Sequence, residues 1–234
     1  VVLYDASLPS ISITIPADGS FMDSDTFTAE GSATDSSGIN LVETRLDGGS
    51  WLSATEDPDW ASWSTELVSL SEGSHTLAAR ATDNDGKTST VSHDFVVDTA
   101  NPAVTIQSPA NGAILTDTTP EVSGIASDSN ALDVVQYRVD GGSWSGVSGT
   151  ENWNVTLSSL INGSHSIDVR ATDVAGKTAD DSITIVIDTQ NPTLSVDNPS
   201  VDLITTDSTP YCSGTAADPD LDKVELRVDS GSWQ

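Results

Sequence analysis

Basic residues are scarce in this 234-residue chain. Eight lysines and arginines stand against 36 aspartates and glutamates, which gives a formal net charge of −28 at pH 7. Nucleic acids and anionic membranes need a basic footprint on the protein, so this balance argues against both as partners. The chain also lacks any apolar run of about 18 residues, the length that a membrane-spanning helix needs. We therefore expect no nucleic-acid binding and no membrane insertion in this segment.

Cysteine and histidine are almost absent as well. The single cysteine, Cys212, excludes a disulfide within the chain, and we expect it to be a small buried hydrophobe. The chain has three histidines. It has no serine or cysteine nucleophile in a recognisable setting, no phosphate-binding glycine loop and no Cys–His zinc pattern, and these absences argue against an enzyme. Because the chain does not begin with Met, we expect it to be part of a longer protein.

What the chain does contain is a repeat of about 90 residues. Leu-Asp-Gly-Gly-Ser-Trp at 46–51 returns at 139–144 with Val in place of Leu, and again at 228–233 as Val-Asp-Ser-Gly-Ser-Trp. Asp-Thr-x-Asn-Pro occurs at 98–102 and, 90 residues later, at 188–192. These repeats predict modules at 1–98 and 99–188, followed by the N-terminal part of a third at 189–234. Such arrays usually span distance or present a surface.

Within each repeat, apolar and polar residues alternate over short runs separated by Gly, Pro, Asn, Asp and Ser, as in half-buried antiparallel strands. The predicted strands are 10–15, 26–34, 41–47, 63–67, 75–82 and 89–97 in the first repeat, and 103–108, 120–127, 134–140, 153–157, 165–172 and 182–187 in the second. About seven strands in 90 residues are typical of a β-sandwich with Greek-key connections. The predicted fold class is all-β, with tandem antiparallel β-sandwiches.

The most distinctive segment of the repeat is Leu-Ile-Asn-Gly-Ser-His-Ser-Ile-Asp-Val-Arg-Ala-Thr-Asp-Val-Ala-Gly-Lys-Thr at 160–178, echoed at 70–88. It resembles the E–F corner, F strand and F–G hairpin of bacterial Ig-like repeats. The resemblance implies a tandem Ig-like segment of a large prokaryotic surface protein, such as an adhesin or appendage, and hence an extracellular location. It does not identify a ligand. His75 and His165 stand where many Ig-like domains have a corner tyrosine, so we expect them to bond back to the chain.

The Asp-Thr-x-Asn-Pro linkers predict metal sites. In an Ig-like array, the strand leaving one module arrives beside the B–C and F–G loops of the next. The side chains expected to meet are Asp98, Asn101, Asp128 and Asp173 at the second module, Asp188, Asn191, Asp218 and Asp220 at the third, and Asp5, Asp35 and Asp83 at the first. At the first module Leu8 stands where Asn would be expected, which weakens that site.

Carboxylates gathered at a joint repel one another unless a cation lies among them. Calcium fits because it takes six to eight oxygen ligands in flexible geometry, whereas magnesium tolerates an irregular set less well. The arrangement is also loosely similar to the calcium-binding linkers of cadherin repeats. The alternative is that these Asp and Asn residues only cap turns through their own backbone. A calcium ion bound by two modules would stiffen a joint that a proline already restrains.

Arginine and tryptophan form two further patterns. All five arginines, at 45, 80, 138, 170 and 227, are predicted on the outer face of strands C and F. They either pair locally with Glu43, Asp168 or Glu225, or contact an acidic neighbour such as another copy of the chain. Strand B is kept slim by Ala29, Gly31 and Ala33, and by Val122, Gly124 and Ala126, so that Trp63 or Trp153 can pack opposite. Trp51, Trp144 and Trp233 are either packed or exposed as a carbohydrate or partner platform.

Three functions remain open from the sequence. The leading hypothesis is a noncatalytic, calcium-stiffened rod in a cell-surface protein, whose immediate partners are its own adjacent repeats. The first alternative is a filament subunit, joined to other copies by lateral contacts or strand exchange. The second is an accessory carbohydrate-binding region of a secreted hydrolase. Beyond the adjacent repeats, the partners left open are other copies of the chain and a cell-surface glycan or protein.

Overall fold

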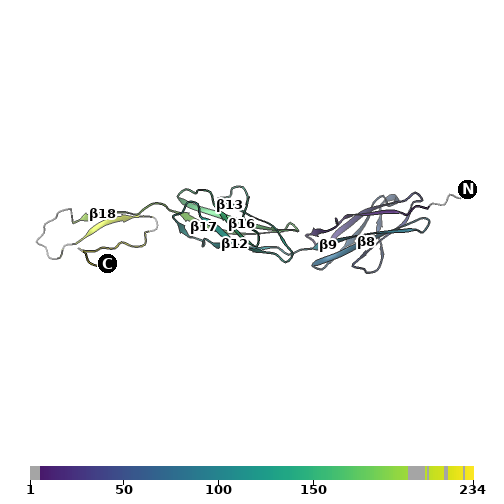
Figure 1. The fold of residues 1–234 in the computed structure, drawn as a ribbon, viewed down its shortest axis with the longest axis horizontal. Coiled ribbons are helices and arrows are strands. Elements are labelled where there is room, and N and C mark those ends of the chain that lie inside the picture. The colour runs from purple at the N-terminus through teal and green to yellow at the C-terminus, as the bar shows by residue number, and fades with distance from the viewer. Residues whose placement is uncertain (1–5, 200–208, 210, 219–220, 229) are drawn as a thin grey trace.

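The computed structural model describes residues 6–199, 209, 211–218, 221–228 and 230–234. Two β-sandwiches and a two-stranded ribbon follow one another along the long axis (Figure 1). The all-β sandwiches predicted from the alternating pattern are confirmed, as is the Ig-like fold that the resemblance implies. Within the described residues, no helix has the length and hydrophobicity needed to cross a bilayer.

The first sandwich has one sheet in the order β1-β3-β7-β6 and a second in the order β2-β9-β8-β4-β5. Its elements are β1 (Ser10–Ile15), β2 (Ser20–Met22), β3 (Phe27–Thr34), β4 (Ile39–Leu46), β5 (Leu52–Ser53), β6 (Thr55–Glu56), the 3-10 turn η1 (Pro58–Trp60), β7 (Trp63–Leu67), β8 (Gly73–Asp83) and β9 (Thr88–Val97). All six strands predicted here are present. The sequence pattern missed β2, β5, β6 and η1, which are too short to show a period.

The second sandwich repeats this plan, with sheets β10-β12-β15 and β11-β17-β16-β13-β14. Its strands are β10 (Ala103–Ser108), β11 (Ile114–Leu115), β12 (Glu121–Ser127), β13 (Leu132–Val139), β14 (Ser145–Gly146), β15 (Asn152–Thr156), β16 (Gly163–Asp173) and β17 (Thr178–Ile187). β11 pairs parallel to β17, as β2 pairs parallel to β9 in the first sandwich, whereas the other pairs are antiparallel. The N-terminal edge of each module is thereby tied to its last strand.

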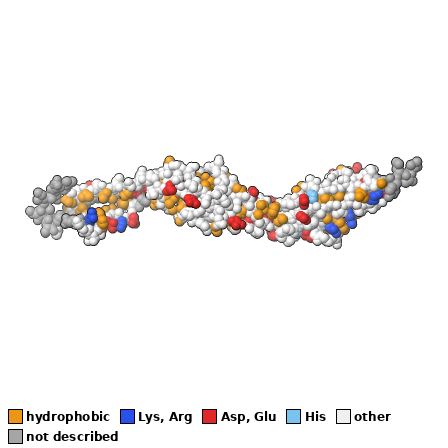
Figure 2. Space-filling model, in the orientation of Figure 1, with side chains coloured by type: hydrophobic (Ala, Val, Ile, Leu, Met, Phe, Trp, Pro, Cys, Tyr) orange, Lys and Arg blue, Asp and Glu red, His pale blue; other side chains and the backbone are white. Residues whose placement is uncertain are grey.

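The third repeat contributes the antiparallel pair β18 (Thr193–Asn198) and β19 (Ser213–Ala217). Hydrophobic side chains lie on its surface (Figure 2), including Leu194 and Val196. Cys212 is also exposed, so the expectation of a buried cysteine is wrong. The reason is that, in the described part of this repeat, no second sheet covers β18 and β19.

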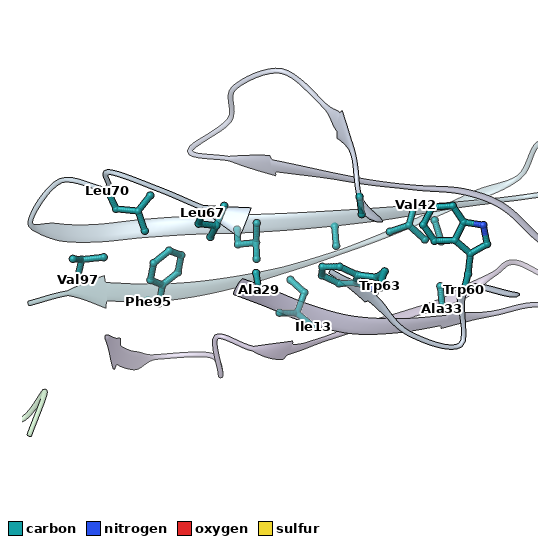
Figure 3. Packing of buried hydrophobic residues seen from close by; sticks show 14 residues of the cluster. Ile13, Ala29, Ala33, Val42, Trp60, Trp63, Leu67, Leu70, Phe95 and Val97 are labelled. Carbon is teal, nitrogen blue, oxygen red and sulfur yellow. The ribbon is translucent and has the colours of Figure 1, made fainter. Parts of the chain in front are cut away.

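Trp63 packs within the core of the first sandwich (Figure 3), and Trp153 belongs to the corresponding core of the second. Trp63 does not face the slim strand from the opposite sheet, as expected, but lies beside Gly31 on the neighbouring strand. A Cβ on Gly31 would lie 2.3 Å from Trp63 Cζ2, and one on Gly124 would lie 2.4 Å from Trp153 Cζ2. The glycines are therefore needed because the indole occupies the space that a side chain would take.

The repeated Asp-Gly turn and the histidine corner are joined in both sandwiches. Asp47 and Asp140 have φ of 50° and 51°, in the left-handed region that such turns require. Nδ1 of His75 lies 2.8 Å from Asp47 Oδ2, and its Nε2 lies 2.8 Å from the Ser71 carbonyl oxygen. Nδ1 of His165 lies 2.7 Å from Asp140 Oδ2. The predicted bond from the corner ring back to the chain is thus present.

Both ring nitrogens of His165 face acceptors, because its Nε2 lies 2.9 Å from the Ile161 carbonyl oxygen. Only a doubly protonated imidazole can donate at both nitrogens. The Asp140 carboxylate and the Ile161 carbonyl accordingly raise the pKa of His165, although burial opposes them. At His75, burial alone would lower the pKa, but the Ser71 carbonyl and Asp47 outweigh it and the pKa is raised.

Candidate metal centre

The linker leaving the first sandwich is held by that sandwich at its first two residues. The N–H of Asp98 donates to the Met22 carbonyl oxygen at 2.9 Å. The N–H of Thr99 donates to Glu72 Oε2 at 3.0 Å, and the Thr99 hydroxyl donates to the same carboxylate. The Asp98 side chain is 0% exposed, and neither of its carboxylate oxygens has a hydrogen-bond partner. A buried carboxylate is thus fixed at the end of one module.

Two carboxylates of the second sandwich face this group. Asp128 follows β12, and its Oδ1 accepts the N–H of Asn130 at 2.8 Å. Asp173 ends β16, is 1% exposed, and accepts the N–H of Lys177 through Oδ1 at 2.8 Å. The Oδ2 atoms of both are buried without a partner. Turn capping and metal binding are therefore not exclusive here, because each aspartate uses one oxygen for its turn and has the other free.

Asp98, Asp128 and Asp173 each place a carboxylate oxygen within 4.8 Å of the others, the only such cluster found among the described residues. At this separation, two full charges repel by roughly 3.5 kcal/mol at an effective dielectric constant of about 20. Three such pairs sum to roughly 10 kcal/mol, as much as the whole stability of a typical domain. A cation among the three carboxylates would relieve this repulsion.

The spacing suits a calcium ion. Two ligands on opposite sides of calcium, each at about 2.3–2.6 Å, are about 4.6–5.2 Å apart. Oxygens that lie within 4.8 Å of one another can therefore ligate one ion with little movement. All three donors are carboxylate oxygens, which are hard ligands of the kind calcium prefers, and no soft or nitrogen ligand belongs to the cluster. Asn101, the fourth predicted ligand, is exposed.

The corresponding residues of the first sandwich already have partners. Oδ1 of Asp35 accepts the N–H and the hydroxyl of Ser37, both at 2.8 Å. Oδ2 of Asp83 lies 3.3 Å from the Lys87 ammonium. Asp5, the third residue predicted for this site, lies outside the described residues. The described carboxylates at this end of the module are therefore satisfied from within the chain.

At the joint after the second sandwich, the predicted residues are only partly placed. Oδ1 of Asp188 accepts the N–H of Gln190 at 2.8 Å, and Asn191 is exposed. Asp188 and Asp218 line one hollow of about 460 Å³, together with Lys223. Asp220 lies outside the described residues. Asp188 and Asp218 do not form a three-carboxylate cluster with any other described residue.

The hairpin tryptophans, which the sequence left between core and surface, stack on the predicted arginine face. Arg45 and Arg80 lie 4.5 Å and 4.4 Å from the Trp51 ring centroid, and Arg138 and Arg170 lie 4.6 Å and 4.7 Å from that of Trp144. Trp233 stacks with Arg227 at 4.5 Å. These cation–π contacts went unpredicted, although the shared outward face of arginine and tryptophan was the available signal.

The predicted local ion pairs of this face are mostly present. Arg80 pairs with Glu43 at 2.6 Å, and Arg138 pairs with Asp168 at 2.8 Å. Glu225 instead pairs with Lys223 at 3.0 Å. Arg170 pairs with Asp180 at 2.7 Å, a contact the sequence did not predict. Most of this positive charge is thus balanced within its own module.

Comparison with known proteins agrees with the fold. A family model described as a bacterial Ig domain matches residues 9–79 and 102–169. The chain is 28% identical over 196 residues to Bacillopeptidase F of Bacillus subtilis (strain 168), covering 83% of this chain and 13% of that protein. It is 31% identical over 154 residues to Halomucin of Haloquadratum walsbyi, covering 64% of this chain and 2% of that protein. It thus spans a small part of either relative.

Among solved structures, the fibronectin(III)-like modules of Clostridium thermocellum CbhA match with a TM-score of 0.54 at 20% sequence identity. The match covers 76% of this chain and 94% of that one. At this level of identity, the likeness extends to the fold alone.

Proposed function

The chain belongs to the bacterial Ig domain family, and from that membership we propose that it is a noncatalytic spacer in an extracellular surface protein. In this proposal the Ig-like modules form a rod, and calcium rigidifies the joint between the first two. The tandem repeat supports a role in spanning distance. The small share of each curated relative that the chain covers is in keeping with a segment of a larger protein.

The observation that carries the proposal is the shared carboxylate cluster. Asp98 is anchored to the first module through the Met22 carbonyl, whereas Asp128 and Asp173 belong to the second. A cation that binds all three would connect the modules by short bonds on either side of the linker. Pro102 already restricts the backbone there. The bound ion would remove much of the remaining freedom to bend.

Calcium is the ion that we propose. Sites in extracellular modules commonly bind calcium with dissociation constants of about 10⁻⁴ to 10⁻³ M. Three carboxylates supply part of the coordination shell, and water or backbone oxygens would complete it. Such an affinity suits a calcium-rich medium outside the cell, which is consistent with the proposed extracellular location.

Two other functions have less support. A carbohydrate platform needs free aromatic faces, but Trp63 and Trp153 are buried and Trp51 and Trp144 are stacked by guanidinium groups. A filament joined through the arginine face needs unpaired positive charge, whereas Arg80, Arg138 and Arg170 all have carboxylate partners. The rod is therefore the function that we favour.

Small-angle X-ray scattering of the chain with calcium and with EDTA tests the proposal. We expect calcium to narrow the distribution of interdomain distances in the wild type and to leave Asp173→Asn unchanged. Asp133→Asn, which removes the same charge from an exposed position on β13, should respond like the wild type. Identical wild-type profiles with and without calcium would refute the proposal.

A further inference from the structure

The two F–G hairpins have the same backbone but place their lysines differently. Their sequences are Asp-Asn-Asp-Gly-Lys at 83–87 and Asp-Val-Ala-Gly-Lys at 173–177. In both, the N–H of the first aspartate donates to the carbonyl oxygen of the lysine at 3.0 Å. The glycines have φ of 84° and 90°. Any difference between the lysine side chains thus arises from their surroundings, not from the turn.

In the first hairpin, the lysine neutralises the buried aspartate. The Lys87 ammonium lies 3.3 Å from Asp83 Oδ2 and 3.9 Å from Asp85 Oδ2. Burial raises the pKa of Asp83, but hydrogen bonds and the Lys87 charge outweigh it, and the pKa is lowered. In the second hairpin, Asp173 Oδ2 is equally buried but has no partner. The ammonium contact that the aspartate has in the first module is thus missing in the second.

Two features explain why Lys177 does not make this contact. Asp85, which helps to hold Lys87 over Asp83, is replaced by Ala175 in the second hairpin. Glu72 of the first module offers Lys177 another negative charge. Hydrogen bonds from Thr99 are the main cause of the lowered pKa of Glu72, and the charge of Lys177 contributes to it. The Lys177 charge thus acts on Glu72 of the first module, and no ion pair between Lys177 and Asp173 is present among the described residues.

We propose that the hairpin lysine is an internal counter-ion that competes with calcium for the buried aspartate, and that the residue two positions before it decides the outcome. With aspartate at that position, Lys87 occupies the first module's carboxylate and excludes a divalent ion from it. With alanine there, Asp173 remains available to calcium. This inference rests on the proposed calcium site and adds the residues that set its affinity.

Ala175→Asp tests the inference by the sign of its effect. Simple electrostatics says that another carboxylate near the cluster tightens calcium binding. The counter-ion mechanism says the opposite, because the introduced carboxylate would draw Lys177 onto Asp173. An exposed or half-exposed ion pair corresponds to about a two- to five-fold change in an equilibrium constant, so we expect calcium affinity to fall by that factor. Lys177→Met in the Ala175→Asp background should restore it to the wild-type value or above.

The measurement is calorimetric titration of the whole chain with calcium chloride. The binding step to follow is the one that disappears in Asp98→Asn, which separates this joint from any other site. Calcium binding by Ala175→Asp that is as tight as in the wild type, or tighter, would overturn the counter-ion mechanism and leave the calcium site standing. Failure of Lys177→Met to restore a weakened Ala175→Asp site would also overturn it. A wild type that binds no calcium would refute the proposed function itself, and the inference with it.

Discussion

Replacing Asp98 by asparagine should make the protein more stable than the wild type in EDTA and less stable than the wild type in calcium. The substitution keeps the size of the side chain and removes one of three charges whose oxygens lie within 4.8 Å of one another. Two of the three repulsive pairs disappear, which corresponds to roughly 7 kcal/mol of repulsion at 4.8 Å and an effective dielectric constant of about 20. Water and dissolved monovalent ions screen part of this repulsion. We therefore expect Asp98→Asn to stabilise the modules by about 1–2 kcal/mol without calcium.

In calcium, the wild type should be more stable than Asp98→Asn. At about 5 mM calcium and a dissociation constant of about 10⁻⁴ M, the wild type gains about 2.3 kcal/mol. For a module of this size, that gain corresponds to a rise in melting temperature of roughly 10–18 °C. Asp98→Asn has lost a ligand and should gain little. Differential scanning calorimetry of both proteins, each in EDTA and in calcium, gives the four melting temperatures to compare.

Asp133→Asn is the matched control, because Asp133 is exposed and belongs to no cluster among the described residues. The melting temperature of Asp133→Asn in EDTA, and its rise in calcium, should both be close to those of the wild type. If Asp98→Asn instead destabilises the protein equally in EDTA and in calcium, the carboxylate has an ordinary structural role. The electrostatic reasoning would then be wrong.

Three further substitutions, the first with a matched control, test the modules themselves by urea unfolding. Gly124→Ala should cost about 1–3 kcal/mol or more, because the new Cβ would lie 2.1 Å from the Thr105 carbonyl oxygen, whereas Gly146→Ala, with nothing within 4 Å, should be nearly neutral. The pKa of His165 is raised in the fold, so its contribution to the free energy of unfolding is complete below about pH 6.5 and is lost as the pH rises through the folded-state pKa. His165→Gln should flatten this decline of stability with pH. An unchanged dependence of stability on pH would contradict the imidazolium pairing. Trp144→Leu removes the stacking of two guanidinium groups on the indole and should lower the free energy of unfolding by about 1 kcal/mol or more. An unchanged free energy of unfolding would show that the stacking contributes nothing.

The sequence predicts most of the fold because the strands are amphipathic and the repeat doubles each signal. β1, β7 and β10 begin and end at the residues predicted from alternation. The slim strand and the tryptophan were also predicted, but not their placement. Gly31 and Trp63 are partners within one sheet, and strand pairing is a tertiary property that periodicity does not contain.

The candidate site was predictable to the level of which aspartates approach one another. Asp98 and Asp173 could be placed at one joint because Ig-like topology brings the linker beside the F–G hairpin. Their burial could not be predicted, nor could the difference between Asp173, whose Oδ2 has no partner, and its counterpart Asp83, which Lys87 neutralises. Those properties depend on where a flexible lysine side chain finds its partner, which strand periodicity and turn motifs do not contain.

The most direct measurement is an anomalous difference map from crystals of this chain grown in calcium. The account predicts one strong peak between the two sandwiches, about 2.3–2.6 Å from an oxygen each of Asp98, Asp128 and Asp173. Density for water alone, with the three carboxylates turned apart, would contradict it.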